Sequence, residues 1–260
     1  MGRIMRARRA VPLLAAIAAA LTLAACGGAG PKAQAAPIVL SYPYGESGPY
    51  LFADYDRVIA VAARSYVHVT IRADAATAAD AGHGLVSAAS GIIVDPAGYI
   101  VTASHIAVDP KYHAEIVTYD GRIHRGEILR VDRDRELALI KIPPVPGLVA
   151  AQFSKTPRLA VGDHTAAVGS PRRIKGVVAL GLVKEPRLTY PLEYNGYVLP
   201  NPIVMTMAAE PGFSGGPVFD ENGELIGMVA SYDYRDGHNF AYAVPVDDIA
   251  AYLRESTATN

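Results

Sequence analysis

Short apolar segments separated by turn residues are the feature of this sequence that most constrains its fold. Residues 66–71 alternate along the chain, and the next apolar segment runs into a turn at residues 95–98, with the sequence D-P-A-G. An Asp-Gly dipeptide at 120–121 and an Asn-Gly dipeptide at 222–223 each lie between two apolar segments, which is a strong signal for a β-hairpin. This pattern predicts antiparallel sheets.

A proline-rich connector, P-P-V-P-G at residues 143–147, divides the predicted strands into two similar halves. We expect strands at residues 66–71, 87–94, 99–102, 114–119, 122–131 and 137–142 before it, and at 164–168, 176–183, 198–207, 218–219, 225–232 and 240–244 after it. Two groups of short strands predict an all-β fold of two small barrels, over residues 50–145 and 146–260. Short helices are expected at 54–64 and 246–254.

The composition argues against several classes of function. The chain has 260 residues, of which 51% are hydrophobic, and its net charge is -1 at pH 7, so one or two compact domains are expected. Its arginine-rich patch lies at the very N-terminus, and we therefore expect no nucleic-acid partner. No spacing of Cys, His and carboxylate residues suits a metal ion, and we expect neither a metal nor another cofactor.

The N-terminal segment has the pattern of an export signal. Arginines precede an apolar run at residues 11–25 that is too short to span a bilayer but suits a secretory signal peptide. The run ends Leu-Ala-Ala-Cys, which resembles a bacterial lipobox. We therefore predict a lipoprotein signal peptide over residues 1–25, a membrane anchor on Cys26, and a flexible spacer over 26–49. The alternative is an ordinary signal peptide. We expect a location in the bacterial cell envelope, lipid-anchored and facing the periplasm or the cell exterior.

A single serine among glycines, in the sequence E-P-G-F-S-G-G-P-V-F-D at residues 210–220, is the candidate nucleophile. A hydroxyl is a weak nucleophile, so acyl transfer by Ser214 needs an adjacent base and donors aimed at the attacked carbonyl oxygen. The backbone N–H groups of Gly212 and Ser214 could form such an oxyanion hole. Taken alone, the same residues also fit a glycine-rich turn before a strand.

His105 and Glu136 are the candidates for the base and for the group that orients it. His105 directly follows a predicted strand, whose end would project the imidazole into a cleft between the halves. The other histidines are interpreted as surface or core residues. Glu136 opens the predicted strand E-L-A-L-I-K-I and is placed to hold the imidazole in its working tautomer.

Several motifs occur in one order and resemble the protease domain of the HtrA (Deg) family of trypsin-like serine proteases. They are S-G-I-I-V-D-P-A-G-Y-I-V-T-A-S-H, V-D-R-D-R-E-L-A-L-I-K-I, V-G-S-P, G-F-S-G-G-P and N-F-A-Y-A-V-P. The resemblance implies a chymotrypsin-like fold of two six-stranded antiparallel β-barrels with short N- and C-terminal helices and a site between the barrels. It also implies that His105 is the general base, that Ser214 is the nucleophile, and that Gly212 and Ser214 form the oxyanion hole.

The chain departs from the family pattern at three points. Glu136 stands where the family has aspartate, so a carboxylate one methylene longer must reach the imidazole. Asp132 and Asp134 could in principle substitute for it, but they fall outside the register and are interpreted as solvated turn residues. Phe213 stands where asparagine or aspartate is usual, and its ring is expected on a substrate wall. The sequence ends at Asn260, soon after the predicted helix, so no PDZ module is expected.

The same register predicts the substrate-binding residues. Ala208 and Ala209 would line the primary pocket, residues Ala230, Ser231 and Tyr232 would pair with the substrate as an added strand, and Asn239 or Phe240 would close the far side. No acid lies at the pocket base, although Glu210 is near, so we expect small or medium apolar residues before the scissile bond.

Three functions agree with the sequence. The first is an envelope serine endopeptidase that cleaves unfolded or secreted proteins through an acyl-enzyme on Ser214. The second is a protease-like peptide-binding lipoprotein that has lost turnover through Glu136. The third is an esterase or other acyl hydrolase with the same triad. The partners are thus protein or peptide substrates and, through Cys26, a membrane; assembly into a homo-oligomer is left open.

Overall fold

The first barrel is built from alternating strands that pair mainly with their neighbours in sequence. Among the described residues its six antiparallel strands close in the order β2-β3-β4-β7-β6-β5. They are β2 (Tyr66–Arg72), β3 (Leu85–Asp95), β4 (Tyr99–Thr102), β5 (His113–Val117), β6 (Ile123–Asp132) and β7 (Leu137–Lys141). Gly98, between β3 and β4, has φ of 99°, and a Cβ there would lie 2.4 Å from the Ile142 carbonyl oxygen, so the turn requires glycine.

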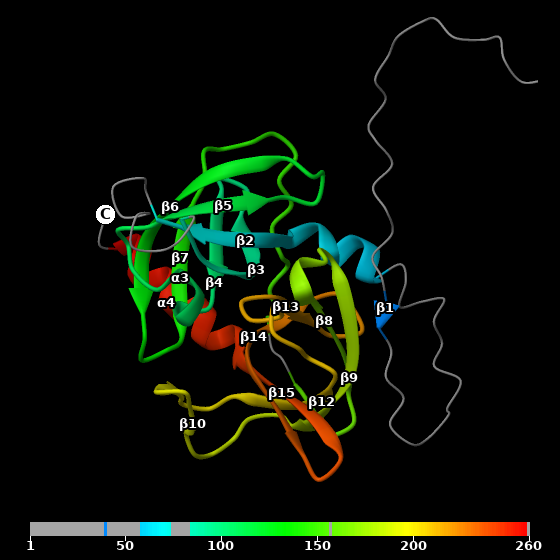
Figure 1. Cartoon of the computed structure of the whole chain (residues 1–260). Coiled ribbons are helices and arrows are strands. Elements are labelled where there is room, and N and C mark those ends of the chain that lie inside the picture. The colour runs from blue at the N-terminus through cyan, green and yellow to red at the C-terminus, as the bar shows by residue number, and fades with distance from the viewer. Residues whose placement is uncertain (1–38, 41–57, 74–83, 156–157, 259–260) are drawn as a thin grey trace, which may run out of the picture. The chain divides into compact units, whose positions relative to one another are not determined.

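The second barrel has the same construction (Figure 1). Its described strands are β8 (His164–Gly169), β9 (Val177–Glu185), β12 (Ile203–Met207), β13 (Pro217–Phe219), β14 (Leu225–Arg235) and β15 (His238–Pro245). They form a ring β8-β9-β12-β15-β14-β13, which the pairing of β13 with β8 closes. These two closed antiparallel barrels confirm the predicted chymotrypsin-like all-β fold.

The structure is a computed structural model that describes residues 39–40, 58–73, 84–155 and 158–258. These residues belong to one compact unit spanning Gln34–Asn260. The predicted signal peptide, the lipidation site Cys26 and the spacer apart from Val39 and Leu40 lie outside the described residues. No helix within the described ranges is long and apolar enough to cross a membrane.

The described elements differ from the predicted ones in the N-terminal spacer and around residues 192–207. Strand β1 (Val39–Leu40) falls in the predicted spacer, where it pairs in parallel with β9. The single strand predicted at 198–207 is two strands, because Pro200 and Pro202 lack the N–H that a continuous ladder needs. Its first part, β11 (Tyr197–Leu199), pairs with β10 (Leu192–Tyr194) in a separate hairpin.

The helices lie near their expected positions. Residues 58–62 are helical and continue into the 3-10 turn η1 (Ala63–Ser65), one residue past the predicted segment 54–64. The closing helix α4 (Val246–Ala258) starts where expected and continues beyond residue 254. One further short helix, α3 (Ser104–Ala107), directly follows β4 and carries His105.

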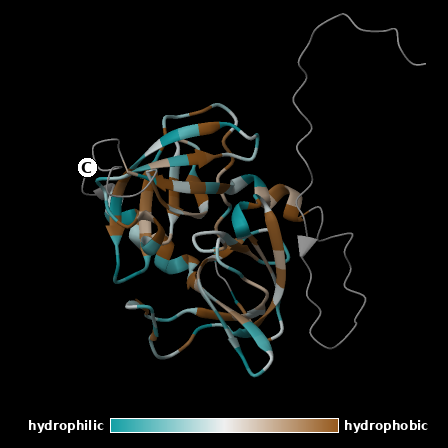
Figure 2. Cartoon of the chain, in the orientation of Figure 1, coloured by the Kyte–Doolittle hydropathy of each residue, from teal (hydrophilic) through white to brown (hydrophobic). Residues whose placement is uncertain are grey.

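The hydrophobic core is shared between the barrels. One cluster of buried residues joins the interior of the first barrel to β8, β9 and α4, for example through Ile140, Val168 and Tyr252. A second cluster fills the interior of the second barrel around Met205 and Phe213. Figure 2 shows hydrophobic residues along the strands and hydrophilic ones at the end of the β14–β15 hairpin. The core therefore holds the facing ends of β4 and β13, which carry the candidate site.

Candidate active site

His105 and Glu136 meet because their strands are neighbours in the first barrel. β4 and β7 pair antiparallel with Thr102 opposite Ala138, and this register, continued past the strand ends, brings Ser104 opposite Glu136 with His105 one residue further on. Nδ1 of His105 forms a hydrogen bond with Oε1 of Glu136. The Glu136 side chain is almost wholly buried, whereas the imidazole is 18% exposed. The carboxylate therefore sets the orientation of the ring and leaves Nε2 for another partner.

Ser104 supports the carboxylate from its other side. Its hydroxyl donates a hydrogen bond to Oε2 of Glu136, and its backbone N–H donates one to the Glu136 carbonyl oxygen at 3.3 Å. Glu136 has φ of 58°, in the left-handed region that costs an ordinary residue roughly 1 kcal/mol or more. The contacts with Ser104 and His105 hold both the backbone and the side chain of Glu136 in this conformation.

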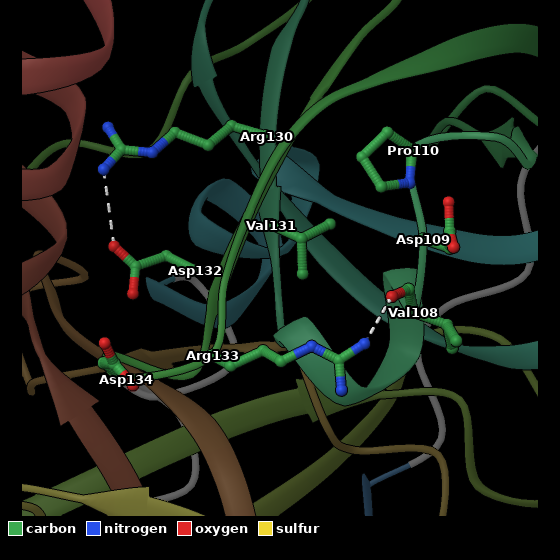
Figure 3. A pocket seen from close by; sticks show the side chains of 8 residues that line it. All are labelled: Val108, Asp109, Pro110, Arg130, Val131, Asp132, Arg133 and Asp134. Atoms are coloured by element: carbon green, nitrogen blue, oxygen red, sulfur yellow. Dashed lines mark hydrogen bonds and ion pairs between the residues drawn. The ribbon is translucent and has the colours of Figure 1, made fainter.

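The two nearby aspartates lie elsewhere. Oδ2 of Asp132 accepts a hydrogen bond from Nε of Arg135 at 3.0 Å, and Asp134 is exposed. Both line a polar surface pocket of about 540 Å³ that also includes Asp109, Arg130 and Arg133 (Figure 3). Figure 3 shows Asp132 joined to Arg130, and Arg133 donating to the carbonyl oxygen of Val108. Neither His105 nor Ser214 lines this pocket. Asp134 is an exposed turn residue, as interpreted, whereas Asp132 is not: it ends strand β6, and its mostly buried carboxylate pairs with Arg130 and Arg135.

Ser214 lies in the tight turn before β13, and the barrel interface fixes that turn. The Gly212 carbonyl oxygen accepts hydrogen bonds from the Ser170 N–H at 3.0 Å and the Ser90 hydroxyl at 2.7 Å. The Ser90 N–H donates to the Ser214 carbonyl oxygen at 3.0 Å. Gly212 has φ of 109°, and a Cβ there would lie 2.3 Å from the Ser170 carbonyl oxygen, so no other residue fits.

This turn meets the end of β4. A Cβ at Gly215, which follows the candidate nucleophile, would lie 2.4 Å from Oγ1 of Thr102 and 3.1 Å from the backbone nitrogen of Ala103. Ala103 precedes His105 by two positions. The turn of the second barrel that carries Ser214 thus packs directly on the strand end of the first barrel that leads into His105.

Within the part of the chain that the structure describes, neither the Gly212 N–H nor the Ser214 N–H donates a hydrogen bond. Two free amides on either side of Phe213 suit an oxyanion hole. The Ser214 hydroxyl also makes no hydrogen bond among the described residues, so no hydrogen bond joins it to Nε2 of His105 in this structure. Such bonds are often long in free enzymes and tighten when substrate binds.

Phe213 corrects one prediction. Its side chain is 1% exposed and belongs to the core of the second barrel, where the ring packs on Gly169. A Cβ at Gly169 would lie 2.5 Å from the ring, so the absence of a side chain there makes room for the phenylalanine. The ring therefore anchors the turn from below instead of lining a substrate wall, as the sequence led us to expect.

The other predicted substrate residues lie along β14 and β15 and at the start of the turn. Ala209, Ala230 and Ser231 are buried, and Ala208, Tyr232, Asn239 and Phe240 are half-buried. Strand β14 pairs with β13 only as far as Met228. From Ser231 onward, β15 is its only partner among the described residues, so the opposite edge of β14 is free. Asn239 and Phe240 pair with the outer part of β14, opposite Tyr234 and Asp233.

Sequence reasoning missed four residues that support or cover this site: Ser90, Ser104, Tyr194 and Tyr197. The two serines act through hydrogen bonds to residues distant in the sequence, Ser90 to Gly212 and Ser104 to Glu136. Only the position of Ser104 directly before His105 could have indicated a role. The two tyrosine rings lie beside the imidazole, with ring centroids 6.5 Å and 5.6 Å from that of His105. An Asn-Gly dipeptide at 195–196 could have indicated their hairpin. Among the described residues, no group of three His, Cys, Asp or Glu side chains is placed to hold a metal ion.

Two closed barrels, with a serine turn packed on the strand end that leads into a His–Glu pair, are the arrangement of the trypsin-like peptidases. Residues 89–228 match the family model of the trypsin-like peptidase domain. The chain belongs to this family.

The relatives it matches are serine proteases by name. A probable periplasmic serine endoprotease, DegP-like, from Halomonas elongata is 32% identical over 65% of this chain and 35% of its own. The putative serine protease HhoA from Synechocystis sp. is 32% identical over 62% and 41%. The periplasmic serine endoprotease DegP from Salmonella typhimurium is 33% identical over 60% and 33%. The match therefore spans less than half the length of each of these relatives.

Proposed function

We propose that this chain is a serine endopeptidase in which Ser214 is the nucleophile, His105 the general base and Glu136 the acid that orients it. The observation that carries the proposal is the hydrogen bond between Nδ1 of His105 and the buried Glu136 carboxylate. The Ser214 turn packs on the end of β4, the strand that leads into His105. This bond keeps the proton on Nδ1 and leaves Nε2 as the basic nitrogen.

The reaction follows from these positions. Nε2 takes the hydroxyl proton while Oγ of Ser214 forms a bond to the peptide carbonyl carbon, and the oxygen that becomes negative receives hydrogen bonds from the N–H groups of Gly212 and Ser214. The imidazolium then gives its proton to the leaving amine as the C–N bond breaks. Water, deprotonated by the same nitrogen, hydrolyses the acyl-enzyme and returns the hydroxyl to Ser214.

The substrate is an extended peptide added to the free edge of β14. An unpaired strand edge offers backbone donors and acceptors to a second strand, and here that edge begins at Ser231, close in sequence to the Val229 carbonyl that binds the Gly215 N–H. The small side chains of Ala208 and Ala209 leave room for a small or medium apolar residue before the scissile bond. Glu210 pairs with Arg172 at 3.6 Å, so its charge is partly compensated.

The proposed location is the cell envelope, with a lipid anchor on Cys26 and unfolded or secreted proteins as substrates. The export pattern of residues 1–25 and relatives that are named periplasmic endoproteases support this location. Cys26 itself lies outside the described residues, so metabolic labelling with a fatty acid, compared between the native chain and Cys26→Ser, is the test of the anchor.

Labelling with a fluorophosphonate tests the catalytic proposal. Only an activated serine displaces fluoride from the probe, so wild-type protein should be phosphonylated at Ser214 and should cleave casein. Ser214→Ala should lose labelling, and its proteolysis should fall by at least about 10⁴-fold. Ser154→Ala, on the connection between the barrels, is the matched control and should behave as wild type.

The outcomes separate the alternatives. A wild-type protein that is not labelled but binds extended peptides is a peptide-binding module without turnover. A protein that is labelled and hydrolyses a simple ester, yet leaves casein intact, is an esterase.

A further inference from the structure

The hairpin β10–β11 has a sequence that specifies one tight turn. Leu192 pairs with Leu199, and Tyr194 pairs with Tyr197 across an Asn195-Gly196 turn. The turn residues have φ of 45° and 81°, the positive values that a two-residue hairpin of this type requires. The register of the two strands is thereby set by the turn itself.

The two faces of this hairpin differ in polarity. Side chains alternate along a strand, so Leu192, Tyr194, Tyr197 and Leu199 share one face, and the exposed Glu193 and Val198 share the other. Leu199 is 1% exposed and belongs to the core cluster that joins the barrels, and Leu192 packs against the same cluster. The leucine pair thus anchors the hairpin, and the tyrosine pair lies nearer its tip.

The tyrosine pair lies against the His105 imidazole. The Tyr197 ring is tilted by 57° to the imidazole, with centroids 5.6 Å apart, and the Tyr194 ring meets it edge-on at 6.5 Å and 70°. The proposed mechanism uses neither phenol. Rings at these distances fill the space beside the imidazole on the hairpin side.

A bound peptide would bring a side chain to this space. Successive side chains of an extended peptide point to opposite faces. In the proposed complex, the side chain of the residue whose carbonyl is attacked points to Ala208 and Ala209 in the second barrel. The side chain of the preceding residue, P2, then points the other way, toward His105 in the first barrel. Its side chain then meets Tyr194 and Tyr197.

We propose that Tyr194 and Tyr197 form an aromatic wall that restricts P2 to small side chains. The inference rests on the proposed peptidase function and names one determinant of its substrate class. A large P2 side chain needs the volume that the two rings occupy, so it binds only if the hairpin moves away from His105.

Peptides that are identical except for alanine or phenylalanine at P2 test the wall. The measured quantity is the ratio of kcat/KM for the alanine peptide to that for the phenylalanine peptide. Wild type should prefer alanine, and Tyr197→Ala and Tyr194→Ala should each lower the ratio by about 10-fold, the scale of discrimination by side-chain volume in a pocket. Tyr197→Phe keeps the ring and should keep the ratio.

Tyr190→Ala is the matched control. Tyr190 lies on the same connection between β9 and β12, but its side chain is 61% exposed. The Tyr190→Ala variant should leave the ratio of kcat/KM values unchanged. Fluorophosphonate labelling of each variant shows that its catalytic site is intact. If Tyr194→Ala and Tyr197→Ala are labelled but keep the wild-type ratio, the proposed aromatic wall is wrong and the proposed function stands. A wild-type protein that is neither labelled nor active would overturn the proposed function, and the wall with it.

Discussion

Glu136 shows how a longer acid can occupy a position where the resembled family has aspartate. Its backbone lies in the left-handed region at φ of 58°, and its carboxylate is buried between the Ser104 hydroxyl and the His105 ring. The extra methylene is therefore accommodated by the backbone turn and by a hydroxyl that fixes the second oxygen. The negative charge, on which the tautomer of His105 depends, is kept.

Removing only this charge should abolish most of the activity. Glu136→Gln keeps the size of the side chain, but its amide favours the wrong tautomer of His105, and kcat should fall by about 10⁴-fold. Single-turnover acylation with an activated ester measures this fall. Glu136→Asp, which keeps the charge, is the control and should lose much less. Equal rates for Glu136→Gln and wild type would remove Glu136 from the proposed triad.

At the scale of elements, helix α4 connects the end of the second barrel to the first-barrel turn before Glu136. The Tyr252 hydroxyl donates to the Arg130 carbonyl oxygen at 3.3 Å, and the guanidinium groups of Arg130 and Arg135 lie 4.9 and 5.7 Å from the centre of its ring. Nη1 of Arg135 donates to Glu255 at 2.9 Å. The helix therefore packs on the residues that lead into β7.

Loss of the Tyr252 ring should destabilise the whole fold. The residue is wholly buried, so Tyr252→Ala leaves a cavity and should lower the free energy of unfolding by about 3–5 kcal/mol. Tyr252→Phe removes only the hydroxyl and should cost about 1 kcal/mol. Urea denaturation measures both changes. Val61→Ala, at a side chain that is 65% exposed, is the control; a loss for Tyr252→Ala no larger than this control would contradict the packing role.

At the scale of the whole molecule, a buried polar cluster joins the barrels behind the serine turn. Nδ1 of His68 on β2 lies 2.8 Å from Oγ of Ser170, which also forms a hydrogen bond with the Tyr66 hydroxyl. Oγ1 of Thr70 lies 3.3 Å from Nε2 of His68. The Ser170 N–H in turn binds the Gly212 carbonyl oxygen. The cluster thus connects β2 to the backbone of the proposed oxyanion hole.

The charge state of His68 should make stability depend on pH. Burial, together with the positive charges of Lys175 and Arg173, lowers the pKa of His68 to about 4. In the unfolded chain the pKa is about 6.5, so between pH 6.5 and 4 the unfolded state binds more protons and is favoured. The contribution of His68 is complete above pH 6.5, and roughly 3 kcal/mol of it is lost as the pH falls to 4.

Urea denaturation at pH 7 and pH 4.5 measures this dependence. His68→Gln should remove most of the His68 contribution, so the variant should lose less stability than wild type over this range. His238→Gln, at an exposed histidine, should keep the wild-type dependence. If His68→Gln and wild type lose the same stability, the titration of His68 does not control the acid sensitivity of the fold.

Local signals in the sequence predicted most of the architecture. The dipeptides at 120–121 and 222–223 lie in turns where Gly121 and Gly223 have positive φ, and the alternating segments became barrel strands. The hairpin at 195–196 carries the same signal, but the predicted strand at 198–207 does not include it. That prediction continues one strand across Pro200 and Pro202, whereas β11 ends before them. The prediction that the Phe213 ring lies on a substrate wall is wrong, because the space that receives the ring is provided by Gly169, far away in the sequence.

The sequence by itself determined where the chain turns, which segments extend, and that a serine, a histidine and an acid occur in the order of a known family. These depend on backbone preferences and side-chain periods over a few residues. Only the tertiary structure decided that Glu136 reaches His105, that the Ser214 turn packs on the end of β4, and that two tyrosines cover the imidazole. Such contacts depend on strand register and core packing between residues distant in sequence, which no local pattern records.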